Sequence, residues 1–280
     1  MDIGVSGLQM EHGDIVVLAK KIEELGFDSV WVPEHTVVPV NHNSTYRGTA
    51  DGSLPESMSH QANPLITLAL AAGATKTLKF GTAVCLVTEH NPLDLAKQVS
   101  TLDYHSGGRF LFGIGTGWFR EESEIMGGDF DHRWSQAKDN VLAMKELWTK
   151  DPAEYHGRFV DFPPVRCLPH PVQKPHPPVL LGGEAKNVFR RIVDWADGWL
   201  PLRMTPEQVA EARATISELA EAAGRDPKSI TITVSGVPTE KDAIKRYEDA
   251  GADRALVRLT QTGEAAVLAE LEEMAQKVFG

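Results

Sequence analysis

Short apolar runs alternate along this chain with longer segments in which apolar residues recur every three or four positions. The short runs are typical of strands buried in a parallel sheet, and the longer period is typical of helices with one buried face. The first such helix covers Ile15–Leu25 and ends at Gly26, a common helix stop. The runs predicted to be strands are Ile3–Leu8, Phe27–Val32, Leu78–Val87, Arg109–Gly115, Val179–Leu181, Gly198–Leu202, Ile230–Val237 and Arg254–Leu259.

Helix-start signals follow several of these strands. Asn63–Pro64, Asn91–Pro92 and Thr205–Pro206 each pair a capping residue with a proline at the first helical position, and Thr239 with Asp242 resembles a capping box. Eight strand–helix units in 280 residues, with no linker between them, predict one α/β domain over residues 1–280. We expect a (β/α)8 TIM barrel with long loop insertions at its C-terminal face; two doubly wound domains are the alternative.

Two irregular segments interrupt the alternation. Thr36–Ala62 and Asp151–Pro177 are rich in polar residues, glycine and proline, and both are too long for ordinary connections. The first is expected to be a lid or partly mobile, and the second is expected to hold a hairpin around His156–Gly157.

Composition limits the kinds of binding partner and the cellular location that we expect for this chain. A hydrophobic content of 42% can fill a large core, and a net charge of −11 argues against nucleic acid or an anionic membrane as a partner. No export signal or long apolar run is present, so a cytoplasmic location is expected. Cys85 and Cys167 have no disulfide-framework spacing, Cys85 reads as a core residue, and no metal-ligand pattern such as HExxH occurs.

Candidate chemistry collects where the predicted strands end, the place at which such barrels bind ligands. Glu34 and His35 follow the second strand, and His35 is the best candidate for moving a proton near neutral pH. Gly113, Gly115 and Gly117 alternate, unlike the dinucleotide fingerprint. The acidic pair after them, at 121–122, is interpreted chiefly as a helix start. A turn at 182–183 running straight into a helix over 185–195 would offer backbone N–H groups to a phosphate.

Four segments together resemble one family. They are Ser106–Phe110 continuing through Gly113–Trp118, then Gly81–Val84, Gly182–Gly183 and Ala196–Trp199. Their order and combination are similar to those of the bacterial luciferase-like monooxygenase superfamily, and most similar to its coenzyme F420-dependent oxidoreductases.

The resemblance implies a flavin-type ring at the barrel mouth, a small-molecule substrate and a homodimer. It implies a catalytic role for His35 near the reacting face of the ring, a cis peptide bond between Ala83 and Val84, and approach of Gly182–Gly183 to the cofactor phosphate. The residues that the resemblance places against the cofactor are Glu34, Ala83, Val84, Leu86, Gly115, Thr116, Gly117, Trp118, Gly182 and Gly183.

One departure bears on the substrate. Sugar-phosphate dehydrogenases of this superfamily carry a glutamate directly after Gly-Thr-Gly, where this chain has Trp118. A tryptophan there favours an apolar or aromatic substrate. Hydride transfer with F420 is therefore the leading hypothesis. An FMN-dependent monooxygenase that activates O2, a non-catalytic flavin-binding protein and a cofactor-free barrel hydrolase are the alternatives.

Overall fold

The computed structural model describes residues 1–46 and 48–280. Its parallel strands close into a barrel, because β3 pairs with both β2 and β5 and β11 pairs with both β1 and β10. β3 and β4 together fill one of the eight positions, so the fold is the predicted (β/α)8 barrel rather than two open sheets. The barrel strands are β1 (Asp2–Ser6), β2 (Ser29–Val32), β3 (Lys79–Thr82) with β4 (Cys85–Leu86), β5 (Phe110–Gly115), β8 (Val179–Gly182), β9 (Gly198–Leu200), β10 (Thr231–Ser235) and β11 (Arg254–Arg258).

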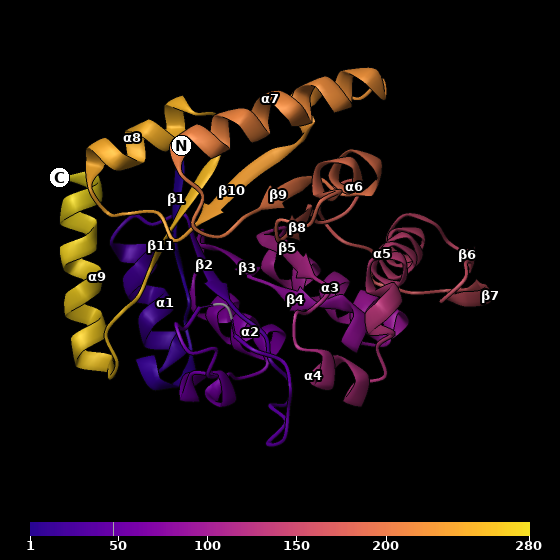
Figure 1. Ribbon diagram of the computed structural model, residues 1–280, viewed down its shortest axis with the longest axis horizontal. Coiled ribbons are helices and arrows are strands. Elements are labelled where there is room, and N and C mark those ends of the chain that lie inside the picture. Colours follow the sequence, from indigo (N-terminus) through magenta and orange to yellow (C-terminus); the bar gives the residue numbers. More distant parts are fainter. Residues whose placement is uncertain (47) are drawn as a thin grey trace.

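Helices surround the barrel, and α7, α8 and α9 cover its last strands (Figure 1). The hairpin predicted around His156 is present as an antiparallel pair, β6 (Ala153–His156) and β7 (Asp161–Val165), which lies outside the barrel. The helices are α1 (Ile15–Glu24), α2 (Pro64–Ala74), α3 (Pro92–Ser106), α4 (Arg120–Ile125), α5 (Arg133–Thr149), α6 (Val188–Trp195), α7 (Pro206–Ala222), α8 (Lys241–Asp249) and α9 (Glu264–Phe279), with short 3-10 turns that include η3 (Val87–Glu89) and η4 (Phe130–His132).

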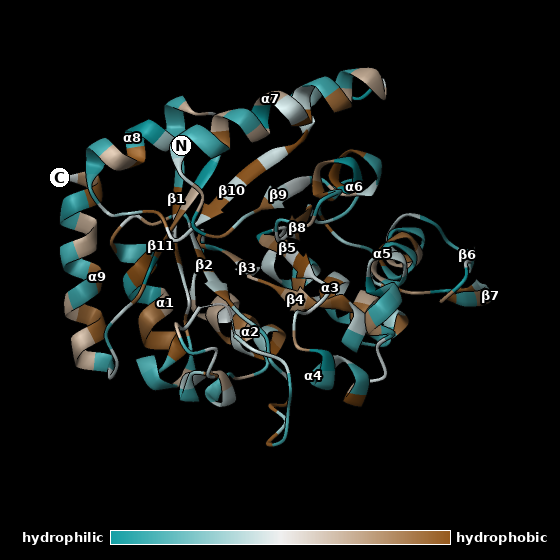
Figure 2. Cartoon of the chain, in the orientation of Figure 1, coloured by the Kyte–Doolittle hydropathy of each residue, from teal (hydrophilic) through white to brown (hydrophobic). Residues whose placement is uncertain are grey.

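The apolar residues fall into two layers, one between the strands and the helices and one inside the barrel. Figure 2 shows the apolar residues of the strands concentrated in the centre and the polar residues on the outer helix faces. The inner layer holds Trp31, Leu111, Leu180, Leu200 and Leu256, so this part of the barrel is a packed core and any ligand space lies above it. None of the described helices is long and apolar enough to span a membrane.

Three of the four predicted helix starts show the predicted capping chemistry. The side chains of Asn63 and Asn91 accept hydrogen bonds from backbone N–H groups in the first turns of α2 and α3, and Thr205 forms a full capping box with Gln208. The predicted box of Thr239 and Asp242 is wrong, because α8 is capped at Glu240 without a side-chain bond. The helix predicted from 185 is also wrong at its start, since α6 begins three residues later, at 188.

The third strand position differs most from the prediction of one strand over 78–87. The peptide bond between Ala83 and Val84 is cis, as the resemblance implied. Gly81 pairs with Leu111 but Cys85 pairs with Ile114, so this strand carries one more residue than its neighbour across the interval. The extra residue makes a bulge that ends β3 and pushes its backbone toward the mouth of the barrel. We call residues 82–86 the bulge.

Candidate active site

Two adjoining cavities open at the C-terminal ends of the strands. The first, which we call the slot, has a volume of about 350 Å³. It is lined by every residue predicted to touch the cofactor except Glu34, and in addition by Trp134, Leu200, Pro201, Leu202 and Ser235. The second, the vestibule, has a volume of about 310 Å³, is lined by Glu34 and His35, and shares Ala83, Val84, Leu86, Trp118, Leu202 and Ser235 with the slot.

The floor of the slot depends on glycines that let strands come close to the bulge. A Cβ atom on Gly115 would lie 2.6 Å from Cγ2 of Val84, and one on Gly182 would lie 2.8 Å from its Cγ1. The bulge is also tied from both sides, because the N–H of Ala83 donates to the carbonyl of Val32 (2.8 Å) and the hydroxyl of Thr82 donates to the carbonyl of Gly113 (2.6 Å). The slot is therefore a fixed, largely apolar surface with room for a flat ring.

Replacing Gly115 by alanine should damage this surface directly. The added methyl group collides with Val84, so we expect a loss of about 1–3 kcal/mol in the free energy of unfolding and a loss of ligand binding in the slot. Gly73→Ala is the matched control, since Gly73 lies on α2 with no atom within 4 Å of the added Cβ. It should be neutral or stabilising by about 1 kcal/mol. Urea denaturation of both variants checks the pair; equal stabilities would contradict the assigned packing.

His35 is held by a carboxylate that the sequence did not single out as its partner. Its Nδ1 lies 2.5 Å from Oε2 of Glu122, and Oε1 of Glu122 accepts the backbone N–H groups of Thr36 (2.8 Å) and Val37 (3.2 Å). Glu122 is fully buried. Because Oε1 accepts two backbone N–H groups and Oε2 faces the imidazole, the arrangement fits Nδ1 of His35 as the donor and Glu122 as the acceptor of the hydrogen between them. Nε2 has no partner among the described residues and belongs to an imidazole that lines the vestibule.

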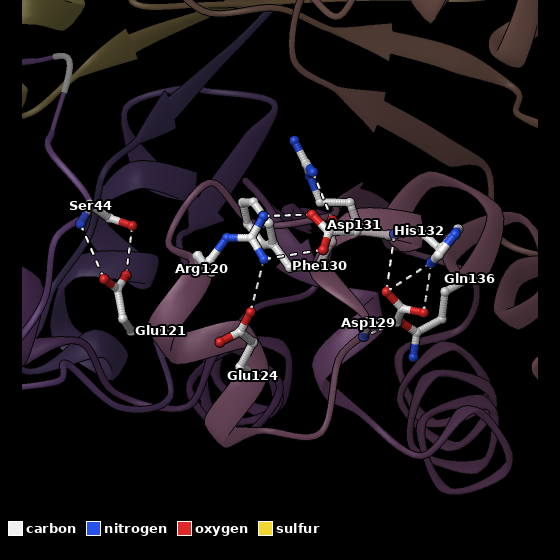
Figure 3. Close-up of polar contacts among 10 residues, drawn as sticks. Ser44, Arg120, Glu121, Glu124, Asp129, Phe130, Asp131, His132 and Gln136 are labelled. Carbon is white, nitrogen blue, oxygen red and sulfur yellow. Dashed lines mark hydrogen bonds and ion pairs between the residues drawn. The ribbon is translucent and has the colours of Figure 1, made fainter.

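The described part of the segment after β2, residues 36–46 and 48–62, which we call the lid, contacts the start of α4 and lines the vestibule. The ring of Tyr46 lies 5.5 Å from that of Trp118, and the ring of Trp118 stacks on Phe119 at 5.0 Å with nearly parallel planes. Glu121 accepts hydrogen bonds from the backbone and hydroxyl of Ser44, as Figure 3 shows. The two glutamates at the start of α4 thus have different tasks: Glu121 holds the lid and Glu122 holds His35.

The first residue of α4 is also fixed by charge. Arg120 forms ion pairs with Glu124 (2.9 Å) and Asp131 (2.5 Å), and its guanidinium lies over the ring of Phe130 at 4.4 Å (Figure 3). These contacts join α4 to the 3-10 turn η4 that leads into α5. The start of the helix that carries Glu122 is therefore held on two sides, by Arg120 and by Glu121, which supports the orientation of His35.

Glu34, predicted to touch the cofactor, has its carboxylate behind the bulge. Oε2 accepts the N–H of Leu86 at 2.6 Å, and Oε1 lies 3.0 Å from Nε2 of His90. Burial favours the neutral forms of both side chains. The hydrogen bond and the opposite charge outweigh it, lowering the pKa of Glu34 and raising the pKa of His90. The resulting ion pair supports the backbone of the bulge from below, which makes Glu34 a positioning residue.

The same corner brings together three potential metal ligands that the sequence pattern did not predict. Atoms of Glu34, Cys85 and His90 lie within 4.8 Å of one another. Burial is the main cause that raises the pKa of the Cys85 thiol well above its usual range, followed by the charge of Glu34. Because metals bind the thiolate, and because Glu34 already accepts two hydrogen bonds, this donor set is poorly suited to a metal ion.

Glu89 is a second acidic residue that the sequence did not mark. It is 4% exposed, and neither carboxyl oxygen has a hydrogen-bond partner among the described residues. A Cβ on Gly117 would lie 3.1 Å from its Oε1, which places it directly beneath the glycine turn of the slot. Burial, with the charges of Glu122 and Glu34, raises the pKa of Glu89 to about 8. The protonated form of Glu89 is therefore favoured at neutral pH.

Three tryptophans at or near the ends of barrel strands, Trp31, Trp118 and Trp199, have different surroundings in the structure. Trp118 lines both cavities, as expected. Trp31 is wholly buried in the inner core, and Trp199 packs against Phe189 while its indole N–H donates to the carbonyl of Gly183. The latter two are packing residues. Trp134 instead reaches the slot from α5, a position that no strand-end pattern indicates.

Comparison with known proteins identifies the family of this chain. Residues 2–277 match the luciferase-like monooxygenase family. The chain belongs to this family. An uncharacterized protein of Mycobacterium tuberculosis is 36% identical to it over 267 residues, which are 93% of this chain and 92% of that protein. An F420-dependent glucose-6-phosphate dehydrogenase of Amycolatopsis mediterranei is 28% identical over 182 residues, 64% of this chain and 50% of that protein.

The crystal structure of the monooxygenase RslO1 from Streptomyces bottropensis has the same fold. Its TM-score is 0.79 at 19% identity, covering 99% of this chain and 98% of that one. Family members are oxidoreductases or monooxygenases, so this luciferase-like barrel is an enzyme of that broad class.

Proposed function

We propose that this luciferase-like chain is an F420-dependent oxidoreductase that passes a hydride between the deazaflavin and a small organic substrate. The observation that carries the proposal is the pairing of an apolar slot, floored by the bulge, with a buried His–Glu pair in the adjoining vestibule. The similarity to an F420-dependent dehydrogenase supports the choice of cofactor.

The residues of the slot fit a flavin-type ring. Val84 forms a surface against which Gly115 and Gly182 leave no space for further side-chain atoms, and Leu86, Leu200 and Pro201 make its surroundings apolar. Gly183 has a φ of +90° and an open space where a Cβ would lie, so its backbone is accessible to a phosphate. Because α6 begins only at 188, this contact would come from the turn itself and not from a helix N-terminus.

The chemistry supplied by F420 when bound is the uptake or release of a hydride. The protein binds and orients the reactants in a cleft that Trp118 and the lid shield from water. Glu122 fixes the tautomer of His35, which leaves the lone pair of Nε2 free to accept a proton from the substrate as it is oxidised. The negative charge of Glu122 stabilises the imidazolium that results, and the reverse reaction returns the proton from Nε2.

The second candidate is an FMN-dependent monooxygenase, which the same apolar slot could serve. Calorimetric titration of the purified chain with F420 and with FMN distinguishes the two. We expect F420 to bind at least tenfold more tightly than FMN, a difference of about 1.4 kcal/mol. Preferential binding of FMN would move the assignment to oxygen chemistry, and binding of neither would overturn the proposal.

A further inference from the structure

Two arginines without a carboxylate partner lie at the mouth of the barrel, beside the vestibule. Arg258 ends β11 and lines the vestibule together with His35. Arg203 follows β9, and both arginines line a larger neighbouring cavity of about 770 Å³, which we call the outer cavity. Neither guanidinium has a hydrogen bond or ion pair to any of the described residues. We propose that these two arginines bind an oxyanion, a carboxylate or a phosphate, that belongs to the organic substrate.

Carboxylates outnumber cationic side chains in this chain, whose net charge is −11. At the opposite end of β11, Arg254 pairs with Asp28 and Asp2, each at 2.8 Å. Arg213 likewise pairs with Asp253. β11 thus carries one arginine that is paired with two carboxylates and a second, Arg258, that has no carboxylate partner among the described residues. A guanidinium is well suited to bind a carboxylate or phosphate through two parallel hydrogen bonds.

The backbone holds both side chains in place over glycines. A Cβ on Gly7 would lie 3.3 Å from Cγ of Arg258, and a Cβ on Gly236 would lie 3.3 Å from Cγ of Arg203. Both glycines have positive φ angles, so a larger residue would be strained there. The stems of the arginines therefore lie across the ends of β1 and β10.

Arg203 itself has a φ of +57°, the only positive φ among the described non-glycine residues. Such a conformation is unfavourable for a residue other than glycine. It is held by the hydrogen bond from the N–H of Arg203 to the carbonyl of Ser235 (2.8 Å). Strain retained at a cavity wall is typical of a residue whose direction matters for a ligand.

The outer cavity also contains negative side chains, and two of them are already engaged. Glu270 accepts hydrogen bonds from Thr260 and Gln261, and Glu273 pairs with Lys277 at 2.6 Å. The third, Glu240, exerts its charge on Lys277. None of them reaches the guanidinium of Arg203 or Arg258. The arginines remain the groups of this cavity that can receive an anion.

The position of the arginines favours a substrate anion over the acidic part of the cofactor. The slot extends from the bulge toward Gly183 and Trp134, on the β8 side of the mouth, and neither arginine lines it. Arg258 is on the vestibule side, with His35. This inference rests on the proposed function: it adds that the molecule oxidised or reduced near His35 has an apolar body and an anionic group that extends toward the outer cavity.

The test uses the F420-loaded enzyme and two probes, benzoate and inorganic phosphate, with binding measured by calorimetry. We expect Arg258→Gln and Arg203→Gln each to weaken binding of the preferred probe about tenfold or more, with F420 affinity unchanged within twofold. Arg190→Gln is the matched control, because Arg190 is an exposed arginine of α6 that lines neither cavity. Preference for benzoate assigns a carboxylate substrate, and preference for phosphate assigns a phosphate ester.

Three results would overturn the inference: no binding of either probe to the wild-type enzyme, equal weakening in the Arg190 control, or a loss of F420 affinity in the two variants, which would assign the arginines to the cofactor. Parallel titration of the apo-protein separates this inference from the proposed function. If F420 fails to bind while the probes bind and depend on Arg203 and Arg258, the cofactor assignment fails and the anion site stands.

Discussion

Replacing His35 by alanine lowers turnover with F420 by an expected factor of about 10²–10⁴, the usual contribution of a positioned acid–base group. F420 affinity should stay within about threefold, because the imidazole lines the vestibule and not the slot. Stopped-flow reduction or oxidation of F420, together with a calorimetric titration, measures the two quantities separately. Turnover equal to that of the wild type would remove His35 from the mechanism.

The same experiment tests the partner of His35. Glu122→Gln keeps the shape of the side chain but removes the charge that fixes Nδ1–H of His35, so turnover should fall by about 10–100-fold. The His35→Ala, Glu122→Gln double variant should be no slower than His35→Ala alone, since groups that act as one unit are not additive. A double variant that loses the product of both factors would show that Glu122 acts independently of His35.

Glu121→Gln is the matched control for this pair. It lies next to Glu122 on α4 but holds Ser44 of the lid and does not contact His35. Its effect should appear as weaker substrate binding through a looser lid, with a small change in the maximal rate. A rate loss equal to that of Glu122→Gln would mean that the lid, and not the orientation of His35, limits turnover.

The barrel was predictable because its information is local. Each apolar run is long enough to form a buried strand, and caps such as Asn63, Asn91 and Thr205 start their helices through neighbouring backbone groups. The bulge was predictable only through the family resemblance: periodicity reads residues 78–87 as one strand, since the extra residue is visible only against the register of β5.

The residues of the candidate site also fall into those that the sequence could predict and those that it could not. The glycines and His35 stand at strand ends, where position in the sequence indicates position at the mouth. Glu122 could not be distinguished from Glu121 by residue type, because which of two adjacent glutamates turns inward depends on how α4 is set against the barrel. Glu89 lies in a 3-10 turn of three residues, too short to show a periodicity. Both were found only by the contacts and burial that the fold creates.

Glu89→Gln should stabilise the protein at alkaline pH and have little effect at acidic pH. The pKa of Glu89 rises from 4.5 to about 8 on folding. Between these values the folded state keeps a proton that the unfolded chain releases, so stability falls as pH rises. A pKa shift over this whole interval corresponds to a loss of roughly 5 kcal/mol in the free energy of unfolding. Relaxation of the protein around the carboxylate reduces this loss. We expect the variant to be more stable than the wild type by about 2–4 kcal/mol at pH 9.

At pH 4, below both pKa values, the difference should nearly vanish, because the protonated carboxyl and the amide are both neutral. Urea denaturation at the two pH values measures it. Glu218→Gln, at an exposed position on α7 without an ion pair to any described residue, should show no such pH dependence. The wild-type residue thus destabilises the fold above neutral pH, a cost that a glutamine would avoid. If Glu89→Gln also changes the pH profile of turnover, the proton held beneath Gly117 contributes to the reaction through Glu122 and His35; an unchanged profile confines Glu89 to stability.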